Sequence, residues 1–185
     1  MIKSITKKLS VLSLIAVFVF VGTLPVYGNN TDELRLDNVQ IVIQEDEESI
    51  FHFHMDSNGE IIGVLIVSKE HAGAMENNIS PRYIPDAPQR GTRSFQHSFN
   101  TGLTQRGIAS DLAFSFTPSI GHAQFTSVFF SRTGLHSNSI VITDADRSGN
   151  RAWVNIRCNN TGQTGGVDFV VNSAGFVTAT QRSLR

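Results

Sequence analysis

Residues 111–117 read DLAFSFT and residues 166–172 read GVDFVVN. In the first stretch Leu112, Phe114 and Phe116 alternate with smaller or polar residues, and the second stretch repeats the pattern. Successive side chains of a β-strand point to opposite faces of the sheet, so a period of two predicts a strand with one buried face. These two stretches therefore predict a β protein with an apolar core.

Similar runs recur through the C-terminal part of the chain, near residues 95–100, 111–117, 123–131, 139–143, 151–158, 166–172 and 175–181. Turn-forming residues separate them, and Ser173-Ala174-Gly175 is expected to close a hairpin. Short strands at this spacing are typical of an immunoglobulin-like or jelly-roll type β-sandwich. The cysteine pair of antibody domains is missing, because Cys158 is the one cysteine.

The region before the sandwich reads as a separate β-meander. Residues 39–43, 50–55 and 61–67 are rich in β-branched and aromatic residues, and Asn58-Gly59 is a strong hairpin turn between two of them. Prolines and arginines then gather over residues 81–93. The expected organisation is an acidic β-meander segment over 29–80, a linker or loop over 81–93, and a β-sandwich domain over 94–185.

The first 28 residues have the features of an export signal. Lys3, Lys7 and Lys8 precede an apolar run over residues 9–24, and Val26-Tyr27-Gly28 offers small residues before a cut. This predicts a signal peptide over 1–28, cleavage near Gly28 and a secreted or extracellular protein of bacterial type. A retained N-terminal anchor is the alternative.

Charge divides the chain into two parts. Residues 29–80 hold eleven acidic side chains against two basic ones, a formal charge of −9, and residues 81–185 hold ten arginines against five aspartates, a formal charge of +5. Opposite charges of this size favour docking of one part on the other, or binding of an anionic partner by the basic part. The alternative is an unevenly charged but otherwise ordinary surface.

One segment resembles the first half of an EF-hand calcium loop. Asp144, Asp146, Ser148 and Asn150 place oxygen-bearing side chains at alternate positions, with a glycine sixth. The twelfth position is Asn155, where an EF-hand has a bidentate glutamate, and the flanking runs read as strands. The sequence thus offers a weak extracellular calcium site in a hairpin loop, with a polar turn as the alternative; no cofactor is required.

Histidine and cysteine give two weaker candidates. His52, His54 and Asp56 share one face of a predicted strand, and a zinc site there would need a further ligand from His71, His97, His122 or His136. A solvated polar face is the alternative. Cys158 is in phase with Val154 and Ile156, which favours a buried hydrophobic role over a nucleophile.

A ligand-binding face is predicted on the run 151–158. Arg151, Trp153, Asn155 and Arg157 project to one side of this strand, and the other side reads as core. An exposed tryptophan between arginines suits stacking on a sugar ring or gripping an anion. Burial of Trp153 under the arginine stems is the alternative.

These features predict an exported bacterial protein that is a non-enzymatic extracellular binding module for an anionic or carbohydrate component of the cell envelope. Two alternatives stay open: a precursor whose acidic N-terminal segment masks a basic effector domain, and a secreted hydrolase that uses carboxylates. The motifs of serine hydrolases, zinc proteases and nucleotide-binding loops are absent from the sequence. Nothing indicates a specific nucleic-acid partner, and the sequence does not define an oligomeric state.

Overall fold

The computed structural model describes residues 39–72, 88–101, 105–133 and 139–185. The predicted signal peptide and its cleavage site, and residues 81–87 of the predicted linker, lie outside these ranges. The elements are β1 (Gln40–Glu45), β2 (Ser49–Met55), β3 (Ile61–Ser68), α1 (Lys69–Ala72), β4 (Gln89–Asn100), β5 (Gln105–Thr117), η2 (Pro118–Ile120), β6 (His122–Thr133), β7 (Ile140–Ser148), β8 (Arg151–Cys158), β9 (Thr164–Val171) and β10 (Val177–Arg182).

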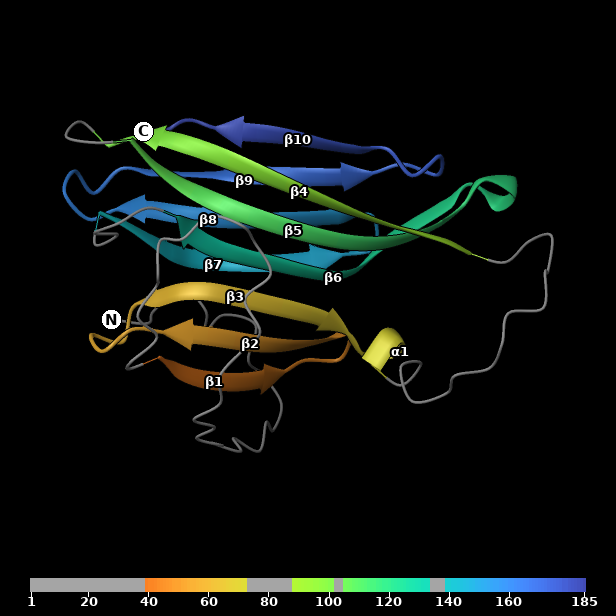
Figure 1. The fold of residues 1–185 in the computed structure, drawn as a ribbon, viewed down its shortest axis with the longest axis horizontal. Helices are drawn as coiled ribbons and strands as arrows, with labels where there is room; N and C mark the ends of the chain where they lie inside the picture. The colour runs from red at the N-terminus through yellow and green to blue at the C-terminus, as the bar shows by residue number, and fades with distance from the viewer. Residues whose placement is uncertain (1–38, 73–87, 102–104, 134–138) are drawn as a thin grey trace, which may run out of the picture.

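The strands form two antiparallel sheets, and the predicted all-β sandwich is confirmed. One sheet has the order β1-β2-β3-β6-β5-β4, and the other has the order β10-β9-β8-β7. Figure 1 shows β4 and β5 crossing over β8 and β9. Apart from the β3–β6 pair, every hydrogen-bonded pair in the described sheets joins strands consecutive in sequence, and the chain passes between the sheets between β6 and β7. Within the six-stranded sheet, β4, β5 and β6 follow one another as hairpins, and the long β3–β4 connection leaves β3 beside β6. The order β3-β6-β5-β4 is that of a Greek key, the connection typical of β-sandwiches.

The core lies between the sheets and is rich in phenylalanine. Phe130 of β6 stacks on Phe169 of β9 with ring centroids 5.9 Å apart, and Phe95 of β4 contacts the same ring at 5.5 Å. Leu112, Phe114, Val167, Phe169 and Val171 are buried, as the alternation predicted. The prediction is wrong for the end of β5, because a register shift between Ala113 and Phe114 leaves Ser115 and Thr117 buried and Phe116 partly exposed. One ring from the four-stranded sheet thus packs on two strands of the six-stranded sheet.

The acidic meander is part of the sandwich. β3 pairs with β6 from Gly63↔Ser131 to Val67↔Ser127, and Val64 and Ile66 are fully buried in the common core. The predicted linker also needs correction at its end, because residues 89–93 are the first residues of β4 and pair with β5. The β4 edge tolerates them, since Arg90, Thr92 and Arg93 are exposed.

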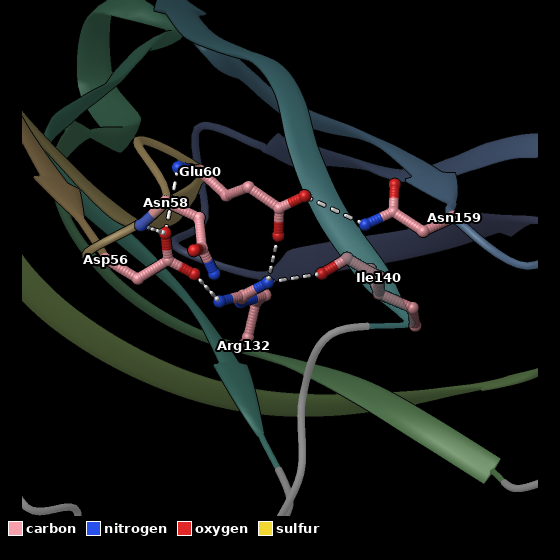
Figure 2. A network of polar contacts seen from close by, with 6 residues as sticks. All are labelled: Asp56, Asn58, Glu60, Arg132, Ile140 and Asn159. Carbon is pink, nitrogen blue, oxygen red and sulfur yellow. Dashed lines mark hydrogen bonds and ion pairs between the residues drawn. The ribbon is translucent and has the colours of Figure 1, made fainter.

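Arg132 attaches the β2–β3 turn to the second sheet (Figure 2). Its guanidinium donates to the Ile140 carbonyl at 2.9 Å, and it forms ion pairs with Asp56 at 3.3 Å and Glu60 at 3.4 Å. Glu60 also accepts a bond from the Asn159 amide at 2.9 Å. The Arg132 side chain is 5% exposed, so these partners compensate a charge that has left water.

Arg147 makes a matching connection to the β1–β2 turn. It donates to the carbonyl oxygens of Phe125 at 2.9 Å and of Glu48 at 3.1 Å. Both arginines are buried, and each contacts a turn of the acidic meander. The acidic and basic parts of the chain are therefore in direct contact, through ion pairs of Arg132 and through hydrogen bonds from Arg147 to backbone carbonyls.

Candidate functional site

The predicted ligand-binding residues lie on the outer face of the four-stranded sheet. On β8, Ala152, Val154, Ile156 and Cys158 are buried, whereas Arg151 and Arg157 are exposed and Trp153 and Asn155 are partly exposed. The alternation read from the sequence is thus the alternation in the structure. Trp153 is partly exposed. Its exposure is therefore intermediate between the two alternatives, an exposed indole and an indole buried under the arginine stems.

Neighbouring strands complete this outer face. Asp146 of β7 and Asp168 of β9 lie directly opposite Trp153 on its two sides, and Asp144 lies opposite Asn155. Directly opposed residues of paired strands point to the same face of a sheet. The residues predicted to bind calcium and those predicted to bind a ligand therefore share one surface, although the sequence analysis treated them as separate sites.

A hydrogen-bonded network orders the centre of this surface. The carboxylate of Asp144 accepts bonds from the Trp153 indole nitrogen at 3.3 Å and from the Asn155 amide at 2.9 Å. The Asn155 carbonyl oxygen accepts a bond of 2.6 Å from Arg182, and Arg182 in turn pairs with Asp168 at 2.7 Å. The network joins all four strands of the sheet, from β7 to β10, and fixes the side chains around the indole ring.

Gly166 makes room for the Arg182 contact. This residue of β9 lies opposite Asn155 of β8 and opposite Arg182 of β10. A β-carbon built on it would overlap the backbone carbonyl oxygen of Val154 and lie 2.7 Å from a guanidinium nitrogen of Arg182. A glycine within a strand often marks such a close approach. A glycine within the predicted strand was a sequence signal that another group approaches closely at this position. The sequence does not show that this group is Arg182, because that depends on the register between β9 and β10.

The charge on this surface is balanced. Asp144, Asp146 and Asp168 stand against three arginines, at positions 151, 157 and 182. Within the described residues, Arg151 and Arg157 form no ion pair, whereas Arg182 does. The centre of the surface is therefore polar and paired, and the two unpaired guanidinium groups lie toward its ends.

The predicted calcium loop is a strand for most of its length. β7 continues to Ser148, so the turn consists of Gly149, with φ of 53°, and Asn150. Asp144, Asp146 and Ser148 follow one another along an extended strand, in which alternate residues are about 6–7 Å apart, and the Asn150 amide donates to the Val171 carbonyl. The described residues contain no group of three His, Cys, Asp or Glu side chains that could hold a metal ion. Calcium binding by these residues stays a prediction.

His52 and His54 lie on the other sheet, with His54 5.7 Å from the ring of Phe129. Burial lowers the pKa of both histidines, and the charge of His52 lowers that of His54 further. Asp56 instead accepts bonds from the turn amides of Asn58 and Glu60 and pairs with Arg132. His97 contacts Phe169 on the core side. The side chains of His71 and His136 lie outside those described.

Cys158 is fully buried at the end of β8. Burial raises the pKa of its thiol, but hydrogen bonds from the Thr161 hydroxyl and from the backbone N–H groups of Thr161 and Asn160 outweigh this effect, and the pKa is lowered. A thiol with no solvent exposure is not accessible to a substrate. Its packing fits the buried role expected from its phase with Val154.

No protein-family profile, curated protein or solved structure matches this chain. Among the residues that the structure describes, no helix is long and apolar enough to cross a membrane.

Proposed function

We propose that this protein is an exported, non-enzymatic binding module that holds a carbohydrate of the cell envelope on the outer face of its four-stranded sheet. The observation that carries the proposal is the position of Trp153, which is partly exposed between Asp146 and Asp168 and begins a hydrogen-bonded network of side chains from four strands. The leader-like first 28 residues support export.

The chemistry of this surface favours a sugar. A saccharide presents an apolar ring face, which stacks on an indole, and hydroxyl groups, which bond to fixed carboxylates, amides and guanidinium groups. Asp144, Asn155 and Arg182 supply those three groups next to Trp153. Because these side chains already hold one another in place, binding a sugar would cost little side-chain entropy.

Balanced charge argues against a purely anionic ligand. Three aspartates lie among the three arginines, and two of them flank Trp153 directly, so a polyanion would meet repulsion at the centre of the surface. Arg151 and Arg157, which are exposed, would admit an acidic group at the ends of a bound glycan. The preferred ligand is a neutral or sparsely acidic glycan.

Sedimentation with bacterial cell walls from which lipid has been extracted tests this proposal. The mature chain, residues 29–185, is expected to sediment with these lipid-free walls at low and at high salt, because stacking and hydrogen bonds are screened much less than charge attraction. Trp153→Ala is expected to weaken retention at least tenfold, a typical cost for removing a central aromatic anchor.

Lys69→Gln is the matched control, since it removes an exposed charge from a different part of the fold. Its retention should equal that of the natural chain. Absence of retention at either salt concentration, or equal retention of the Trp153→Ala variant, would refute the proposed site. Retention that disappears at high salt would instead indicate an anionic ligand.

A further inference from the structure

A second surface lies at one end of the sandwich, where two turns meet. Figure 1 shows the β5–β6 turn and the β9–β10 turn at the same end of the molecule. Phe116, near the end of β5, packs on the β9–β10 turn so closely that a β-carbon built on Gly175 would lie 2.7 Å from its ring. The two turns are therefore held together by a direct contact between the sheets.

The β9–β10 turn is built like the β2–β3 turn but ends differently. In each turn, the side chain at the first position accepts bonds from the backbone N–H groups two and four residues later. Asn172 accepts from Ala174 and Phe176. Asp56 accepts from Asn58 and Glu60. The last residue of the β2–β3 turn is Glu60, which is used in the Arg132 network. The last residue of the other turn, Phe176, is 67% exposed.

Exposed apolar side chains concentrate at this end. In the part of the chain that the structure describes, three large apolar side chains are exposed: Ile120 at 72%, Phe176 at 67% and Val170 at 36%. Ile120 ends η2 in the β5–β6 turn, and Phe176 ends the β9–β10 turn. The two most exposed ones therefore lie on turns at the same end, and each turn holds its apolar residue outward.

Two arginines border Phe176. A groove of about 380 Å³ is lined by Arg90, Arg93, Phe116 and Phe176, together with neighbouring residues of β4, β5 and the β9–β10 turn. Both arginines are exposed on the edge strand β4, and neither forms an ion pair with a described residue. The end of the sandwich thus combines unpaired positive charge with protruding apolar side chains.

We propose that this end of the sandwich, formed by Arg90, Arg93, Ile120 and Phe176, docks on the surface of an anionic lipid bilayer. A bilayer offers both layers that the surface needs, negative headgroups for the arginines and, about 5–10 Å deeper, acyl chains for the apolar tips. A soluble polyanion offers no apolar layer. A stable protein interface buries about 1,200–2,000 Å² in total, whereas this surface offers two separate apolar turn residues and two arginines.

Vesicle sedimentation tests this inference independently of the Trp153 surface. The mature chain is expected to bind vesicles made of equal parts of phosphatidylcholine and phosphatidylglycerol, and to bind vesicles of phosphatidylcholine alone much more weakly. Phe176→Ser should weaken binding about tenfold, through loss of apolar burial. Arg90→Gln and Arg93→Gln should each weaken it about fivefold, and only on the anionic vesicles.

Val170→Ser is the matched control, because Val170 is exposed near the same end but lies on the outer face of β9 and does not line the groove. Its vesicle binding should equal that of the natural chain, and so should that of Trp153→Ala. Circular dichroism of each variant checks that it is folded. Failure of the natural chain to bind anionic vesicles, equal binding to both vesicle types, or unchanged binding by folded Phe176→Ser would each overturn the inference.

Discussion

Replacement of Arg132 by methionine tests how the acidic meander is attached to the rest of the fold. Removing one partner of a fully buried ion pair costs about 3–5 kcal/mol, because the remaining charge stays unpaired. Asp56 and Glu60 are 20% and 30% exposed, so water reaches both carboxylates when the guanidinium is gone. Loss of the bond to the Ile140 carbonyl adds to the cost. We expect Arg132→Met to lower the free energy of unfolding by about 2–3 kcal/mol.

Urea unfolding followed by circular dichroism measures this change, and a loss of this size corresponds to a fall in Tm of about 4–12 °C for a domain of this length. Lys69→Gln is the control. Its ion pair with Glu45 joins side chains that are 39% and 57% exposed, and its removal should cost less than about 1 kcal/mol. Equal, small effects of the two substitutions would refute the view that Arg132 is buried and paired.

Three other outcomes follow from the structure. Phe169→Ala should lower the free energy of unfolding by about 3–5 kcal/mol in a urea titration, because it leaves a cavity under two facing rings; a loss below about 1 kcal/mol would contradict the proposed core. Burial lowers the pKa of His52 and His54 below the ordinary value of 6.5, so the unfolded chain binds more protons, and stability should be complete above pH 6.5 and fall as the pH drops through it. A His52→Gln, His54→Gln double variant should show less of this fall, and an unchanged pH profile would refute the contribution of these histidines. Calcium binding by Asp144, Asp146, Ser148 and Asn150 would raise Tm in millimolar Ca²⁺ above its value in chelator, and Asp144→Asn should abolish the rise; a Tm within about 1 °C of the chelator value would contradict the calcium site.

The alternation of apolar and polar residues predicted a strand and its buried face where one face is apolar and the other is polar. The run 151–158 has this clear alternation, and β8 begins and ends at those residues. β7 extends five residues past the predicted end, because Asp144 and Asp146 have low strand propensity but lie on the outer face, where their carboxylates are bonded or near water. Local propensity therefore misplaced the hairpin turn.

The contacts that assemble the candidate site depend on strand register, which the sequence pattern does not specify. Asp144 and Asn155 are eleven residues apart, and Arg182 reaches Asn155 from a strand that is not its neighbour. Burial of Arg132 depends equally on a distant pairing, that of β3 with β6, which brings Glu60 to it. Alternation identifies the face of a residue, and register decides its neighbours.

Fluorescence of Trp153 during titration with soluble glycan fragments of bacterial cell envelopes tests the proposed function most directly. Trp153 is the one tryptophan of the chain, so the signal reports on the centre of the proposed site alone. A saturable change in emission, with protection of the indole from a soluble quencher, is the predicted result. Emission and quenching that stay unchanged across the glycan fragments would contradict carbohydrate binding at this surface.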